Sequence, residues 1–185
     1  MVYEPKEFLL KDGKKVIFKS PEPRDAKLMI DNIVAVASST DNLLSAPHDF
    51  DKYYADISLE ERWIVSNREG PNYLIAVYLN GVIIGSCSLN MHPQEKVKHR
   101  ATIGIAIQKP YWGKGIGSLL FDEMIQIGKG IGLEQIELDV IASNDRAKRL
   151  YTKKGFVKTG NLPHELKLKD GSYLDGETMV LFLKK

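Results

Sequence analysis

Two apolar runs joined by Asn80-Gly81 are the feature that most restricts the fold of this chain. The runs Tyr73–Leu79 and Val82–Leu89 are rich in the β-branched and aromatic residues that strands prefer. Asn-Gly supplies the two residues with positive φ that a type I′ turn needs, so the segment is predicted to be an antiparallel hairpin. The rest of the core has to be built around a sheet that contains this hairpin.

The remaining patterns predict strands and helices on both sides of the hairpin. Before it we expect a strand at Lys14–Lys19 and helices at Asp25–Thr40 and Ser58–Asn67, the second capped by Ser58. After it we expect strands at Ala101–Ile107, Gln135–Ile141, Phe156–Thr159 and Thr178–Leu183, and helices at Ile116–Ile127 and Asn144–Lys153. A meander followed by strand–helix–strand units predicts a mixed sheet with helices on its faces. No stretch resembles a linker, so one domain over residues 1–185 is expected.

Composition and charge exclude several classes of function. The 26 basic residues nearly balance the 24 acidic ones, so net charge gives no reason to expect a nucleic-acid partner. Cys87 is the sole cysteine, and the histidines lack zinc-ligand spacing, so no disulfide and no metal are expected. We expect His48 and His92 to lie exposed in polar loops. No apolar run is long enough for a signal peptide or a membrane span, which predicts a cytoplasmic protein without a membrane partner.

The segment Gly113–Ser118 follows a predicted strand and opens an amphipathic helix. The first turn of a helix has unpaired N–H groups and a partial positive charge, and glycines let a phosphate approach them. This placement predicts an anion site, most simply for a diphosphate. Ser118 stands where a dinucleotide-binding fingerprint needs its third glycine, and the phosphate-loop pattern of nucleotide hydrolases is also absent. The same five letters recur at Gly128–Gly132, where they are predicted to end the helix.

Two runs of the chain carry longer motifs. The run Ile105-Ala-Ile-Gln-Lys-Pro-Tyr-Trp-Gly-Lys-Gly-Ile-Gly-Ser-Leu-Leu resembles the acyl-CoA-binding motif, Q/R-x-x-G-x-G/A, of the GNAT superfamily of N-acetyltransferases, with Trp112 in place of Gln or Arg. The run Asn144-Asp-Arg-Ala-Lys-Arg-Leu-Tyr-Thr-Lys-Lys-Gly-Phe matches the family's N-x-x-A-x-x-L-Y-x-x-x-G-F segment, with Gly155 as the helix end. Asn144 is expected to cap this helix, to contact pantetheine through its amide, or to do both. The likeness covers the chain from Tyr73 onward, whereas the earlier residues carry no motif.

The resemblance implies a fold, a cosubstrate and a set of binding residues. It implies a single-domain α/β acyltransferase fold, with a mostly antiparallel mixed sheet of about seven splayed strands and about four helices. It also implies acetyl-CoA as cosubstrate, with the diphosphate held by the glycine loop and the pantetheine arm in the splay. The basic run Arg146–Lys154 is expected to form a solvated face, with a role near the adenosine phosphates as the alternative. The implied binding residues are Ile105, Ala106, Ile107, Trp112, Gly113, Lys114, Gly115, Ile116, Gly117, Ser118, Asn144, Ala147 and Tyr151.

The resemblance also suggests catalytic residues. Tyr151 would act as general acid toward the leaving thiolate, although an aromatic packing role is the alternative. Asp139 lies five residues before the motif Asn and, as a buried carboxylate, would serve as general base. His99 competes for that role because imidazole titrates near neutral pH, and a water chain without a single base is the third alternative.

The predicted activity is direct transfer of an acetyl group to a primary amine of an amino acid, a small amine or a protein N-terminus. Cys87 lies mid-strand and no G-x-S-x-G motif occurs, so no covalent enzyme intermediate is expected. The alternatives are a regulatory module that binds acyl-CoA without turnover and a nucleotide-binding domain. A homodimer is expected from the resemblance alone.

Overall fold

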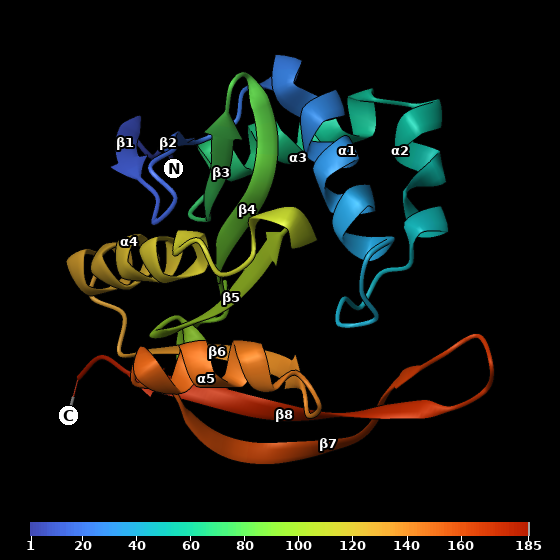
Figure 1. Cartoon of the computed structure of the whole chain (residues 1–185). Helices are drawn as coiled ribbons and strands as arrows, with labels where there is room; N and C mark the ends of the chain where they lie inside the picture. The colour runs from blue at the N-terminus through green and yellow to red at the C-terminus, as the bar shows by residue number, and fades with distance from the viewer. Residues whose placement is uncertain (185) are drawn as a thin grey trace. The chain divides into compact units, whose positions relative to one another are not determined.

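The computed structural model describes residues 1–184, whose backbone contacts group into two compact units (Figure 1). The first unit contains Met1–Asn90 and Gly104–Gly117, and the second contains Met91–Ile103 and the chain from Ser118. The single domain over residues 1–185 stays a prediction. None of the helices among the described residues is both long and apolar enough to cross a bilayer.

The first unit has four antiparallel strands in the order β1-β2-β3-β4. They are β1 (Lys6–Leu9), β2 (Lys15–Lys19), β3 (Tyr73–Leu79) and β4 (Val82–Met91), and the helices of this unit are α1 (Ala26–Ala37), α2 (Asp51–Ala55) and α3 (Ser58–Glu69). Leu79 pairs with Val82, and the intervening Asn80 and Gly81 have φ of 51° and 83°. The predicted hairpin and its turn are confirmed.

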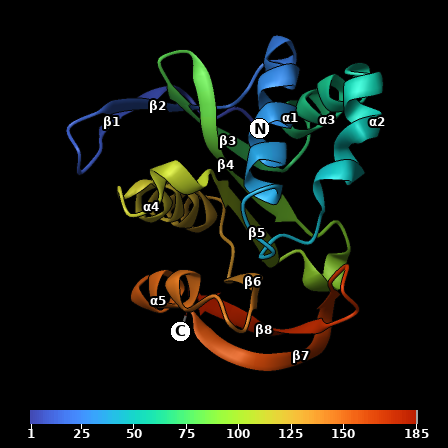
Figure 2. The same cartoon turned by 45° about the vertical axis from the view of Figure 1, so that its right-hand side comes forward.

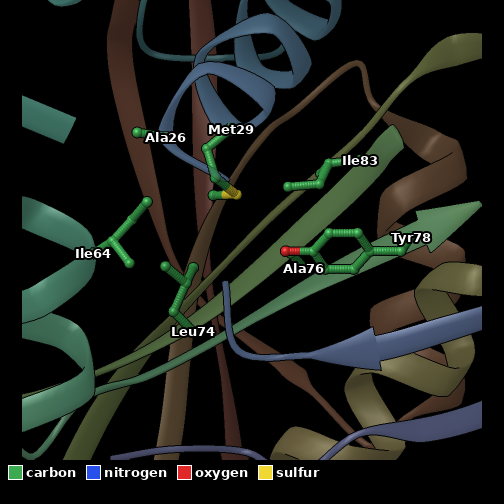
Figure 3. Packing of buried hydrophobic residues seen from close by; sticks show 7 residues of the cluster. All are labelled: Ala26, Met29, Ile64, Leu74, Ala76, Tyr78 and Ile83. Carbon is green, nitrogen blue, oxygen red and sulfur yellow. The ribbon is translucent and has the colours of Figure 1, made fainter. Parts of the chain in front are cut away.

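The core of the first unit lies between its helices and the β3–β4 hairpin. Every second residue of β3 points to one face, and Leu74, Ala76 and Tyr78 meet Ile83 of the neighbouring strand there. Figure 3 shows Ala26 and Met29 of α1 and Ile64 of α3 facing these side chains. A fully buried Ile or Leu contributes about 1.5–3 kcal/mol relative to an exposed one, so this cluster is a main source of the unit's stability.

The helix starts of the first unit differ in detail from the prediction. Ser58 is the first residue of α3 and makes no side-chain cap. Instead, its N–H and hydroxyl both donate to Oδ1 of Asp56, at 3.1 and 2.6 Å. The prediction that Ser58 caps this helix was therefore wrong, because the Asp56 carboxylate, two residues earlier, accepts the Ser58 N–H. At α1 the buried Asp25 accepts the Glu22 N–H and the Tyr78 hydroxyl, and burial raises the pKa of Tyr78.

In the second unit, the start of β5 (Arg100–Ile107) is followed in the sheet by three further strands, in the order β5-β6-β8-β7. Its other strands are β6 (Gln135–Ile141), β7 (Val157–Lys167) and β8 (Tyr173–Phe182), and its helices are α4 (Ile116–Gly130), which begins in the first unit, and α5 (Asp145–Lys153). Residues Arg100–Thr102 pair in parallel with β6, while β8 is antiparallel to both β6 and β7. In the turned view of Figure 2, as in Figure 1, α5 lies alongside β6 and β8.

The observed elements confirm the mixed α/β class with small differences in number. Eight strands and five α-helices occur among residues 1–184, against about seven and about four expected. The additions are the short β1 and the five-residue α2, which are too brief for a clear periodic pattern. Strands β7 and β8 are longer than predicted. The prediction ended β7 too early because Gly160 and Pro163 interrupt the strand pattern in the sequence, at the place where the β7–β8 register is irregular. Proline is tolerated there because β7 is an edge strand.

Candidate active site

The glycine loop begins where β5 ends and closes at the start of α4. A single 3₁₀ turn, Lys109–Tyr111, follows β5, and Gly113 and Gly115 then have φ of 79° and 98°. These left-handed conformations cost any other residue about 1–2 kcal/mol, which explains the glycines. No atom beyond the adjoining residues lies within 4 Å of the position that a Gly113 Cβ would occupy. The loop therefore leaves open space beside Gly113, three residues before α4 begins, and the free amides of a helix start are the donors that an anion site requires.

Two side chains tie the start of the loop to strands β4 and β5. Trp112 Nε1–H donates to the carbonyl of Ile107 at 2.6 Å, which ties the loop back to β5. Gln108 donates its backbone N–H to Ile84 and its Nε2 to the carbonyl of Ile83. The departure of Trp112 from the family's Gln or Arg thus supplies a backbone anchor. The Ile107 carbonyl, expected to pair with pantetheine, already accepts this bond.

Gln108 also reaches a buried polar residue that the sequence did not single out. Its Nε2 lies 3.1 Å from Oδ1 of Asn32, a residue of α1 that is 1% exposed. The pattern that could have revealed Asn32 is a polar residue on the apolar stripe of a helix. Gly85 was missed too: a Cβ there would lie 3.2 Å from the Ala106 carbonyl oxygen. A glycine within an apolar strand is the usual signal of such a close backbone approach.

The turn between β1 and β2 lies against the glycine loop, although no motif pointed to it. Lys114 Nζ forms a 2.8 Å ion pair with Asp12, and its carbonyl accepts the Lys11 N–H at 3.2 Å. The hydrogen bond from Lys114 lowers the pKa of the Asp12 carboxyl. Ile116, by contrast, is 1% exposed and belongs to the core. The predicted binding residues numbered 105–117 all belong to the first unit.

The second motif lies in the second unit and forms α5 with its two ends. Asn144 Oδ1 accepts the Ala147 N–H at 3.2 Å, so the expected capping role is confirmed. Gly155 has φ of 93° and ends the helix, and Phe156 is fully buried beside it. A contact between Asn144 and pantetheine stays a prediction, as does any such role for Ala147 or Ser118.

Tyr151 projects from α5 into an aromatic cluster. It is 7% exposed, and its ring centroid lies 5.1 Å from that of Phe121 and 6.1 Å from that of Phe156. Aromatic pairs at such separations add about 0.5–1.5 kcal/mol each, so the ring has a structural role. Its hydroxyl as a proton donor remains a prediction.

Asp139 lines a small hollow on the sheet of the second unit. The hollow has a volume of about 190 Å³ and is lined by Thr102, Glu137, Leu138, Asp139 and Thr178. Thr178 Oγ1 donates to Asp139 Oδ1 at 2.7 Å. The expectation that Asp139 is buried was wrong: it is exposed, because Ile136, Leu138 and Val140 alternate with it along β6 and take the buried positions.

His99 does not line this hollow. It is half-buried just before β5, and its carbonyl accepts the N–H groups of Glu134 and Gln135. Of the two candidates for the general base, Asp139 therefore lines this hollow and His99 does not.

A charged cluster that the sequence missed lies beside Asp139. Glu137 Oε1 lies 2.9 Å from both Arg100 Nη2 and His92 Nε2, and the Thr102 hydroxyl is 3.4 Å from the same imidazole nitrogen. His92 lies in the loop after β4, as expected, but these contacts leave it half-buried, so the expected exposure was wrong. Glu137 and Asp139 share a face of β6, and that i,i+2 spacing is the signal that could have joined them.

A second, open hollow of about 520 Å³ runs along α5. It is lined by Asp145, Lys148, Arg149, Thr152 and Lys153. Three of these five side chains are basic, so the hollow favours an anion. Among residues 1–184, no three His, Cys, Asp or Glu side chains are grouped so that they could hold a metal ion.

Comparison with known proteins assigns the family. The sequence model of the acetyltransferase (GNAT) family matches residues 37–156, which is more than half of the chain and includes both motifs. The chain belongs to the GNAT family of acetyltransferases. The L-amino acid N-acetyltransferase AaaT of Escherichia coli K12 is 27% identical over 90% of this chain and 97% of its own length.

Solved GNAT structures share the fold. A GNAT-family acetyltransferase from Streptococcus pneumoniae has a TM-score of 0.83 at 25% identity and covers 90% of this chain and 99% of its own. The acetyltransferase yncA of Salmonella typhimurium, solved with its cofactor acetyl-CoA, has a TM-score of 0.77 at 18% identity over 92% of this chain and 95% of its own.

Proposed function

We propose that this GNAT protein transfers the acetyl group of acetyl-CoA to a primary amine. The observation that carries the proposal is the glycine loop, in which the left-handed Gly113 and Gly115, the first with open space beside it, lead into the first turn of α4. Unpaired amides and the helix dipole at this point suit a diphosphate. The family assignment and the acetyl-CoA bound to yncA support the choice of that cosubstrate.

The binding role divides among three groups of the chain. The amides of Gly113–Ser118 hold the diphosphate, and the backbone of Ile105 and Ala106 holds the pantetheine amides and polarises the thioester carbonyl. Asn144 contributes a side-chain contact while it caps α5. The anchors from Trp112 and Gln108 keep the loop in place before the ligand binds, which lowers the entropic cost of binding.

Proton transfer is assigned to two side chains. Asp139, oriented by Thr178, accepts a proton from the acceptor ammonium, directly or through water, and the free amine attacks the thioester carbon. When the tetrahedral intermediate collapses, the carbon–sulfur bond breaks and Tyr151 protonates the leaving thiolate, while the second proton of the attacking nitrogen passes through water to the tyrosinate and restores the phenol. Arg100 already pairs with Glu137, so Asp139 is the carboxylate of the hollow that favours a cationic acceptor. L-amino acids are the first acceptors to test, because AaaT is named for them.

A thiol-release assay tests the proposed activity. Purified protein is incubated with acetyl-CoA and a panel of L-amino acids, polyamines and N-terminal peptides, and binding of CoA is followed by calorimetry. We expect CoA binding and amine-dependent thiol release. Binding without release from any amine supports the regulatory module, and stabilisation by a dinucleotide but not by CoA supports the nucleotide-binding alternative.

Substitutions test the catalytic assignments. Asp139→Asn should lower kcat about 100-fold or more, the usual contribution of a general base, while Asp41→Asn, an exposed control, should leave it unchanged. Tyr151→Phe should lower kcat but leave the Kd for CoA unaltered, since the ring stays in its aromatic cluster. A base at His99 would instead make His99→Ala the inactive variant.

A further inference from the structure

The β1–β2 turn supplies a cation to the glycine loop. Three contacts place it there: the Lys11 N–H bonds to the Lys114 carbonyl, Asp12 pairs with Lys114 Nζ, and the Lys11 side chain runs past Gly115. The Cγ and Cε atoms of Lys11 lie 3.7 and 3.8 Å from the position of a Gly115 Cβ. These residues are about a hundred positions apart in sequence and share no motif.

The two lysines at this place differ in their electrostatic state. Asp12 neutralises Lys114 at 2.8 Å. Among residues 1–184, Lys11 has no carboxylate within ion-pair distance, and its side chain is exposed. Its ammonium is one covalent bond beyond the Cε that lies over Gly115, the residue that turns the chain into α4. An uncompensated cation beside a helix start strengthens the binding of an anion at that start.

We propose that Lys11 binds the phosphates of the cosubstrate, with the N-terminal hairpin acting as a wall of the diphosphate site. This inference rests on the proposed function, because it takes CoA as the ligand of the glycine loop. Asp12 holds the Lys114 ammonium beside the turn, so that Lys11 is the cation left to the ligand. The residues before the first motif then contribute to cosubstrate affinity as well as to the fold.

Lys11→Met separates the charge from the packing, because methionine keeps atoms at the Cγ and Cε positions and loses the ammonium. Calorimetry in dilute buffer measures the Kd of each variant for CoA and for pantetheine, which lacks the diphosphate. We expect the Kd of Lys11→Met for CoA to rise about threefold to tenfold, the range for a partly exposed charged contact. The Kd for pantetheine should stay unchanged, and added salt should shrink the CoA difference.

Two variants serve as controls. Lys11→Arg keeps the charge and should bind CoA like the wild type, and Lys15→Met removes an exposed lysine of β2 without effect. The proposal is overturned if Lys11→Met binds CoA as tightly as the wild type, or if it loses affinity for pantetheine equally. A wild-type protein that does not bind CoA overturns the proposed function itself, which distinguishes the two failures.

Discussion

The pentapeptide Gly-Lys-Gly-Ile-Gly occurs at residues 113–117 and again at 128–132, and it adopts two conformations. In the first copy, Gly113 and Gly115 are left-handed and the helix starts only at the isoleucine. In the second copy, the first three residues continue α4, and only Gly132 is left-handed, with φ of 81°. Five identical residues therefore begin a helix in one place and end it in the other.

The flanking residues explain the difference. The first copy follows a 3₁₀ turn that contains Pro110 and an anchored Trp112, so no helix precedes it. The second follows three turns of an established helix, and adding residues to a helix is far easier than starting one. Ile116 is 1% exposed and Ile131 is 43% exposed, so the isoleucine is buried in the first copy and exposed in the second. A short sequence match thus has functional meaning only with its neighbours.

Substitution of the isoleucine should show the largest difference between the copies, in the free energy of unfolding. Ile116→Ala should lower the free energy of unfolding by about 2–5 kcal/mol, because it leaves a cavity in the core. Ile131→Ala should change it by no more than about 0.5 kcal/mol, since that side chain is partly solvated. Urea denaturation measures both. Equal losses would mean that the copies do not differ in burial.

The glycine at the third position of the pentapeptide compares the copies in cosubstrate binding. Gly115→Ala should weaken CoA binding about tenfold, because φ of 98° costs alanine about 1–2 kcal/mol and the loop has to move. The matched Gly130→Ala lies in the helix and should leave the Kd for CoA unchanged. Calorimetry gives both constants. Unaltered binding by Gly115→Ala would remove the loop from the diphosphate site.

Within the second copy, neighbouring glycines should respond in opposite directions. Gly130→Ala should stabilise the protein by about 0.5–1 kcal/mol, because alanine favours the helix and open space surrounds its Cβ. Gly132→Ala should destabilise it by about 1 kcal/mol, since φ there is 81°. Thermal and urea unfolding check the signs. Stabilisation by both substitutions would contradict the assigned helix end.

The lysines should give the smallest effect, a change in one carboxyl pKa. In the wild type the Lys114 hydrogen bond lowers the pKa of Asp12, so Lys114→Gln should raise it toward its ordinary value, while Lys129→Gln should not. A lowered native pKa stabilises the protein above the ordinary Asp range, and this stabilisation is lost as the pH falls through the lowered pKa. Carboxyl NMR titration of Asp12 measures the shift. An unchanged titration in Lys114→Gln would show that the ion pair does not form in solution.

Local patterns predicted much of the fold and part of the site. The Asn80-Gly81 turn, the strand Gln135–Ile141 and the caps at Asn144 and Gly155 follow from interactions within a few residues, and all are confirmed. The exposure of Asp139 was predicted wrongly, although the alternation along β6 was visible in the sequence. The catalytic roles of Tyr151, Asp139 and His99 stay predictions.

The sequence by itself determined most of the helices and strands, apart from β1, α2 and the full length of β7 and β8, and it marked the glycine loop, because backbone conformation depends largely on near neighbours. Only the tertiary structure decided which distant side chains meet. It brought Asp12 to Lys114, Asn32 to Gln108, and His92 with Arg100 to Glu137. Such pairs form because the packing of whole helices and strands fixes the positions of these residues. The charge or amide group of one residue does not by itself determine which distant residue it contacts.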